Sequence, residues 1–292
     1  MEFELVRWAQ YGLLCLLFGV PATMVLLGAR VPAERARRPI LLLALASVPT
    51  TAAGFLLLVA RMAGVDLHEL DPALVAEVLI GSALGWAAIA RMLGLVAALA
   101  MLMQRRTHFV WLLLPTVIAW GSLAWSGHAA ASESMLGMIR LAVDVVHLLA
   151  ASIWLGALAF FLFMLSQTGP AEPGARALSR FSGLGSALVA LLVATGIGNL
   201  LFLSGPRQWG ALGLTPYGLL LITKIGLFCA MLGLAAGNRF VLVPRLLQAQ
   251  AGAALDARRA MQISIALEMM LGAGVLGVVA VLGLLDPTGG AG

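Results

Sequence analysis

The stretch "RLAVDVVHLLAASIWLG", residues 140–156, places an Arg, an Asp and a His inside an apolar run that reads as a membrane span. A helix needs about 20 consecutive apolar residues to cross the hydrocarbon core of a bilayer. Ionisable groups at that depth are costly, almost always face the bundle interior, and usually serve a function. This segment is therefore the first candidate for a functional helix.

The rest of the chain has the composition of a polytopic membrane protein. Of its 292 residues, 62% are hydrophobic and only 11% are charged. The loops are short, so we predict an all-α helix bundle that forms a single membrane domain over residues 1–292. The first apolar run is too long and its start too acidic for a removable signal peptide, so we expect it to stay. The expected spans, about eight transmembrane helices, are 5–28, 38–62, 76–103, 109–127, 136–166, 180–204, 215–237 and 262–285.

Basic residues gather in alternate loops. Most of the 18 Lys and Arg residues fall in loops 28–40, 104–108, 167–180 and 238–261, whereas the opposite loops are acidic or neutral. Cytoplasmic loops of membrane proteins carry the excess of Lys and Arg, so both termini are predicted to be periplasmic. The net charge of +5 then reports topology, and we expect no nucleic-acid partner.

The opening stretch carries a polar stripe. Asp144, His147, Ala151 and Trp154 follow Arg140 at intervals that line one face of an α-helix. Arg140 and Asp144 can pair at this spacing, and Asp144 can also reach His147. A carboxylate beside an imidazole fixes its tautomer and strengthens it as a metal ligand. The alternative is that the Arg140–Asp144 pair only staples the outer end of the helix.

Other charged residues also lie within expected spans. Arg91, Lys224 (the only lysine) and Glu268 are each surrounded by apolar sequence. Together with the stripe they exceed what a passive scaffold would keep, and they are candidates for an ion path. Arg91 and Lys224 are possible partners of Asp144 and Glu268.

The donors available to a metal are mainly His and Met. The sequence lacks the C-x-x-C, H-E-x-x-H and P-loop motifs, and we expect no enzymatic activity. Imidazole and thioether suit a soft monovalent cation such as Cu(I). An outer site would use His128, Met135 and Met138, and a deep site would use His147.

The remaining sulfur residues divide into two groups. Met101 and Met103 mark a possible exit at the cytoplasmic end of the third expected span. Cys15 and Cys229 stand singly inside spans, so a disulfide framework is excluded and both are expected to be buried apolar residues.

Four stretches together resemble the copper resistance protein D (CopD) family of bacterial inner-membrane proteins. They are "SGHAA", "DVVHLLAASIWLGAL", "GSALGWAAIARMLG" and "LTPYGLLLITKIGLFCAMLGLAAGNRFVLVPRL". The resemblance implies copper transport across the inner membrane, usually toward the cytoplasm, with a periplasmic CopC-like copper-binding partner. It marks His128, His147, Trp154, Gly156, Lys224, Asn238, Arg239 and Pro244. The chain departs from the family pattern at Ala157, where a second Gly is usual, and at Trp8 and Gln10, where many members carry a His.

Three functions stay open at this point. The first is a copper permease, whose transport would be passive or driven by the membrane potential because no nucleotide site is present. The second is a haem b-binding electron-transfer protein, because histidines on membrane helices commonly ligate haem. The third is a copper-binding scaffold or metallochaperone, in which the polar stripe would be structural.

Overall fold

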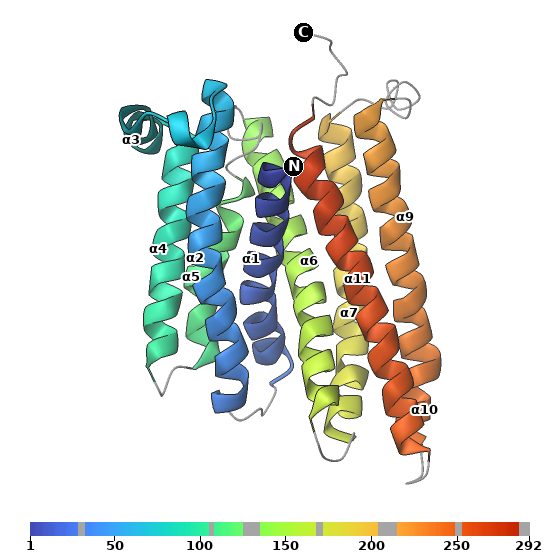
Figure 1. The fold of residues 1–292 in the computed structure, drawn as a ribbon. Coiled ribbons are helices and arrows are strands. Elements are labelled where there is room, and N and C mark those ends of the chain that lie inside the picture. Colours follow the sequence, from blue (N-terminus) through green and yellow to red (C-terminus); the bar gives the residue numbers. More distant parts are fainter. Residues whose placement is uncertain are drawn as a thin grey trace.

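The computed structural model describes residues 1–28, 33–104, 108–124, 135–167, 172–203, 215–248 and 253–285. These residues form an elongated bundle of helices, and none of them forms a strand (Figure 1). The all-α membrane fold predicted from the sequence is confirmed. Seven of the described helices are long and apolar enough to cross a membrane. The helices are α1 Glu2–Leu26, α2 Ala33–Ala63, α3 Pro72–Gly81, α4 Ala83–Met103, α5 Phe109–Gly121, α6 Met135–Ser166, α7 Glu172–Leu203, α9 Pro216–Gly237, α10 Val243–Gln248 and α11 Ala254–Leu282.

Two expected spans differ from the structure. The third was expected over 76–103, but the helix is interrupted at Ser82. Of this segment, therefore, only the part in α4 has the length of a membrane span. Ser82 has an extended backbone, and its hydroxyl accepts a hydrogen bond from the Gly85 amide at 3.0 Å, which starts a new helix. The fourth is helical over Phe109–Gly121, shorter than a full span, and residues 125–127 lie outside the described part.

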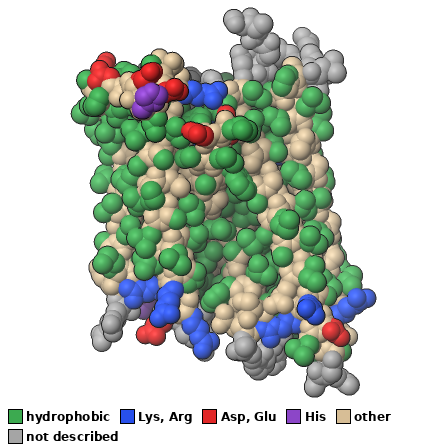
Figure 2. Space-filling view, in the orientation of Figure 1, with side chains coloured by type: hydrophobic (Ala, Val, Ile, Leu, Met, Phe, Trp, Pro, Cys, Tyr) green, Lys and Arg blue, Asp and Glu red, His purple; other side chains and the backbone are tan. Residues whose placement is uncertain are grey.

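On the face shown in Figure 2, the charged side chains lie near the two ends of the bundle, and apolar side chains cover the belt between them. The start of α2, the short helix α10 and the start of α11 bring basic residues to one end. The start of α1 and the end of α11 lie together at the other end (Figure 1). That the basic end faces the cytoplasm stays a prediction from the positive-inside rule.

Arginines at the basic end bind the carboxyl ends of neighbouring helices. Arg37 donates to the carbonyl of Leu102 on α4. Arg258 of α11 donates to the carbonyl of Leu165 on α6 at 2.6 Å, and Gln262 donates to the same oxygen at 2.8 Å. The last carbonyls of a helix have no partner within it and carry partial negative charge, so these contacts stabilise the helix ends.

α1 and α6 cross at two glycines, and this contact joins the two halves of the bundle. A Cβ atom added at Gly19 would clash with the carbonyl group of Ser152, and one added at Gly156 would clash with the backbone of Gly19. The hydroxyl of Thr23 donates to the carbonyl of Ile153 at 3.2 Å across the same contact. Small residues let membrane helices approach closely enough for backbone contact. The crossing fixes the position of α6, which carries the polar stripe.

Candidate functional site

Two cavities lie among α6, α7, α9 and α11. α7 packs on α6 and α10, whereas α9 packs mainly on α11, so side chains of α7 and α9 face each other across open space. The His147 cavity has a volume of about 390 Å³ and is lined by His147, Lys224 and Met231, among mainly apolar side chains. The Glu268 cavity has a volume of about 550 Å³. Trp154 and Leu232 line both cavities.

The tautomer of His147 is set by α7. The Nδ1 atom of His147 lies 2.8 Å from the hydroxyl oxygen of Thr195. The Thr195 hydroxyl donates its only proton to the carbonyl of Leu191, at 2.6 Å, one turn earlier on α7. The oxygen can therefore only accept from His147, so Nδ1 carries the proton in the neutral ring. The Nε2 lone pair is left free for a metal ion.

Asp144 has a different environment from the one the sequence suggested. We expected it to orient His147, but Thr195 makes that hydrogen bond. The carboxylate of Asp144 instead accepts a hydrogen bond from Asn199 of α7, and the charge of Lys224 acts on it from α9. No contact ion pair joins Asp144 to Arg140, although the charge of Arg140 also acts on it.

These contacts follow from the antiparallel register of α6 and α7. Asp144 lies one turn before His147 on α6, and Asn199 lies one turn after Thr195 on α7. Two neighbouring rungs therefore join the helices. The stretch "TGIGN", residues 195–199, places two polar residues, Thr195 and Asn199, one turn apart inside a span. This spacing is the sequence signal for the α7 partners of His147 and Asp144.

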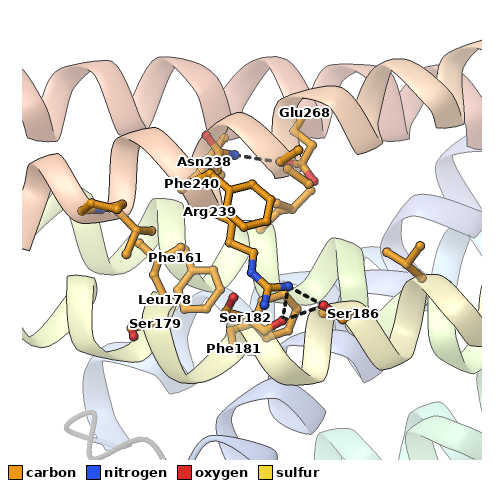
Figure 3. A pocket seen from close by; sticks show the side chains of 18 of the residues that line it. Phe161, Leu178, Ser179, Phe181, Ser182, Ser186, Asn238, Arg239, Phe240 and Glu268 are labelled. Atoms are coloured by element: carbon orange, nitrogen blue, oxygen red, sulfur yellow. Dashed lines mark hydrogen bonds between the residues drawn. The ribbon is translucent and has the colours of Figure 1, made fainter.

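The Glu268 cavity contains a buried carboxylate held by two uncharged donors. Trp154 Nε1 donates to Oε1 of Glu268 at 2.8 Å, and Asn238 Nδ2 donates to Oε2 at 3.0 Å. Glu268 is 1% exposed. Figure 3 shows the side chains of Asn238 and Glu268 pointing toward each other, joined by this hydrogen bond.

A π-helical turn places Asn238 there. The turn spans Asn238–Leu242 and joins α9 to α10. Pro244 follows it, has no N–H group, and would clash with the carbonyl four residues earlier in a regular helix, which favours the wider turn. The guanidinium of Arg239 bonds the carbonyl of Ser182 and the hydroxyl of Ser186 on α7 (Figure 3).

Arg91 and Lys224 have different surroundings. Arg91 is 6% exposed and donates from Nε to the hydroxyl of Ser122 at 3.0 Å, and from Nη2 to its carbonyl at 3.4 Å. It thus holds the end of α5, just before residues 125–134. Lys224 lines the His147 cavity. The charge of Lys224 acts on both Asp144 and His147.

The other predicted metal donors are dispersed. Met135 and Met138, in the first turn of α6, are 70% and 56% exposed, and His128 lies outside the described residues. Met101 and Met103 are on α4, which packs on α2, α3 and α5, and neither lines either cavity.

Among the described residues, no group of three His, Cys, Asp or Glu side chains could hold a metal ion. His68 belongs to a short 3₁₀ turn before α3, and His108 precedes α5. Neither of these two histidines lines the His147 cavity.

The two cysteines differ in their surroundings. Cys15 is buried in the core, as expected, whereas Cys229 is exposed on α9 and lines the His147 cavity. The expectation of burial is therefore wrong for Cys229. Its sulfur adds a soft donor to the walls that carry His147 and Met231.

Comparison with known proteins identifies two family models on this chain. The copper resistance protein D-like N-terminal domain matches residues 3–138, and copper resistance protein D matches residues 175–282. The chain is 34% identical to copper resistance protein D of Pseudomonas syringae pv. tomato, over 97% of this chain and 96% of that protein.

Two further relatives match over shorter ranges. The inner membrane protein YebZ of Escherichia coli is 32% identical over 67% of this chain and 66% of its own length. The copper transport protein CutJ of Bacillus subtilis is 32% identical over 46% of this chain and 25% of its own length. No solved structure matches.

Proposed function

The chain belongs to the copper resistance protein D family, and from this premise we propose that it carries copper ions across the inner membrane. Its membrane-length helices and its relatives make it a multi-pass inner-membrane protein. The proposal adds a direction, a ligand and a path. Copper enters from the periplasmic end, binds His147 and leaves at the basic end.

The observation that carries the proposal is the free Nε2 of His147. Thr195 binds the opposite ring nitrogen, so the imidazole is held in the tautomer and orientation that a metal ligand requires. The cavity beside it also offers the thioether of Met231 and the thiol of Cys229. These soft donors suit Cu(I) better than a hard divalent ion. Few donors at one point favour transient binding, which a transported ion needs.

The path follows one face of α6. An outer site at His128, Met135 and Met138 would receive the ion and pass it to His147. Trp154 lies seven residues further along α6, about 10 Å by helical rise, and lines both cavities. We route the inner half past Trp154 into the Glu268 cavity, because Met101 and Met103 line neither cavity.

Copper binding at His147 needs the negative charge of Asp144 to offset the positive charge of Lys224. Lys224 places a positive charge near His147, which would repel an arriving cation. Asp144 offsets that charge from the neighbouring turn of α6. Inward movement of one positive elementary charge across the membrane potential releases about 2.3 kcal/mol of free energy per 100 mV. Transport therefore requires no nucleotide. A periplasmic CopC-like protein would deliver the ion at the outer end.

The test is copper uptake into cells or proteoliposomes with His147→Gln, and with His108→Gln as the matched control. His108 precedes α5 and lines neither cavity, so its variant should transport at the normal rate. We expect His147→Gln to lose most of the uptake and the bound copper. Normal uptake in His147→Gln would overturn the path. Stoichiometric iron with a Soret band, and no copper, would replace copper transport with haem binding.

A further inference from the structure

We propose that the Glu268 cavity binds a small hard monovalent cation, a proton or a sodium ion, at a site separate from the copper ligand His147. The site consists of the Glu268 carboxylate and the side-chain oxygen of Asn238. Glu268 comes from α11 and Asn238 from the π-helical turn after α9, and both line the cavity on the basic side of Trp154.

The charge of Glu268 points to a bound cation. The carboxylate is 1% exposed and sits mid-way along α11, and its two hydrogen-bond donors, Trp154 and Asn238, are both uncharged. No Lys or Arg of the described residues forms a contact ion pair with it. An ionised carboxylate buried without a counter-charge is strongly disfavoured. A bound cation or proton supplies the missing positive charge.

The side chain of Asn238 offers an acceptor that has no donor. Asn238 is 7% exposed, and its Oδ1 atom is buried with no hydrogen-bond partner. Its Nδ2 is already committed to Glu268, so the amide is held with Oδ1 beside the carboxylate. Buried acceptors are nearly always satisfied in native proteins. Oxygen atoms are the ligands that hard cations prefer, whereas Cu(I) prefers sulfur and imidazole nitrogen.

The cavity gives the carboxylate of Glu268 room for a cation. It holds about 550 Å³, well above the volume of a hydrated monovalent ion, and Ser182, Ser186 and Arg239 are among the residues that line it. The guanidinium of Arg239 is tied to the two serines on α7, not to Glu268. A cation can therefore reach the carboxylate without first displacing an arginine from it (Figure 3).

Two residues, Trp154 and Leu232, line both this cavity and the His147 cavity, and Trp154 also contacts the carboxylate. Neutralising Glu268 weakens the charge-assisted hydrogen bond that holds the indole, so the wall between the cavities becomes easier to move. Cation binding requires only Glu268 and Asn238, whereas a role of the bound cation in driving copper transport rests on the proposed function.

The experiment measures thermal unfolding of the purified full-length protein in sodium chloride and in choline chloride at equal ionic strength. Infrared spectra of the same samples, recorded as the pH is lowered, follow the band of a protonated carboxyl group. The variants are Glu268→Gln and Asn238→Leu, and the second keeps the test open if the first fails to fold. His147→Gln leaves the site intact. Gln10→Leu is the matched control, because Gln10 is a buried amide that donates to Thr51 and lines neither cavity.

Two results would support the proposal. Stabilisation by sodium that is lost in Glu268→Gln and Asn238→Leu, and kept in the two other variants, assigns a sodium site. No sodium effect, together with a carboxyl band that grows at low pH and is absent in Glu268→Gln, assigns a proton. Neither effect in the wild-type protein would overturn the proposal. A sodium or proton effect without copper uptake would leave this site standing and remove copper transport alone.

Discussion

The imidazole of His147 and the hydroxyl of Thr195 meet at 2.8 Å between α6 and α7, and the hydroxyl proton is already bound to Leu191. This hydrogen bond decides which ring nitrogen can bind a metal. His147 is therefore oriented by Thr195 of α7 and not by Asp144 of its own helix.

Thr195→Val tests that role directly. Valine keeps the shape of threonine but cannot accept from Nδ1, so the neutral ring is free to change tautomer. Loss of such an outer contact typically costs about 10–100-fold in metal affinity, and we expect a decrease of that order for Cu(I), measured by competition with a chelator. Nitrogen chemical shifts of the ring report the tautomer.

Thr223→Val is the matched control for that experiment. The hydroxyl of Thr223 also donates to a carbonyl one turn earlier, that of Leu219 at 2.9 Å, but Thr223 is exposed and lines neither cavity. Its variant should bind Cu(I) normally. Equal affinity and an unchanged tautomer in Thr195→Val would show that the hydrogen bond is only structural.

Asp144 and Lys224 should act on copper in opposite directions. Asp144→Asn removes the negative charge that offsets Lys224, so we expect uptake to fall strongly. Lys224→Met removes the repelling charge, and the double variant should recover part of the lost uptake. A double-mutant cycle on uptake rates measures the coupling. Strictly additive effects would mean that the two charges act separately.

The glycine crossing of α1 and α6 predicts an asymmetry between two glycines on one helix. Gly19→Ala inserts a methyl group against the backbone of Ser152, so we expect destabilisation of about 1–3 kcal/mol from overpacking. Gly12→Ala, also on α1, meets nothing within 4 Å and should be neutral or slightly stabilising. Thermal unfolding in detergent compares them, and equal stabilities would contradict the close crossing.

Arg91 should matter for stability and not for copper binding. Its guanidinium binds the hydroxyl and carbonyl of Ser122 at the end of α5. Hydrogen bonds to charged groups are worth about 1.5–3 kcal/mol each, so Arg91→Gln should lower the unfolding temperature clearly. Cu(I) affinity of the folded fraction should be unchanged. A variant that is stable but binds copper poorly would return Arg91 to the ion path.

Much of the fold is determined by the sequence alone. Apolar runs of membrane length located the helices, because a bilayer requires about 20 such residues in each. The break at Ser82 was missed, since a capping serine within apolar sequence does not interrupt the hydropathy of the segment. The ionisable groups of α6, α9 and α11 were all found in advance, because charge inside a span stands out against an apolar background.

The partners of those groups were decided by the tertiary structure. Trp154 and Glu268 are 114 positions apart, and His147 and Thr195 are 48 apart. Helical periodicity specifies which residues share a face, but not which helix that face meets. The antiparallel packing of α7 on α6 identifies Thr195 and Asn199 as partners of the α6 residues. The π turn, which directs Asn238 toward Glu268, identifies Asn238 as a partner of that carboxylate. The sequence therefore determined where polar groups enter the membrane, and helix packing decided which donor meets which acceptor.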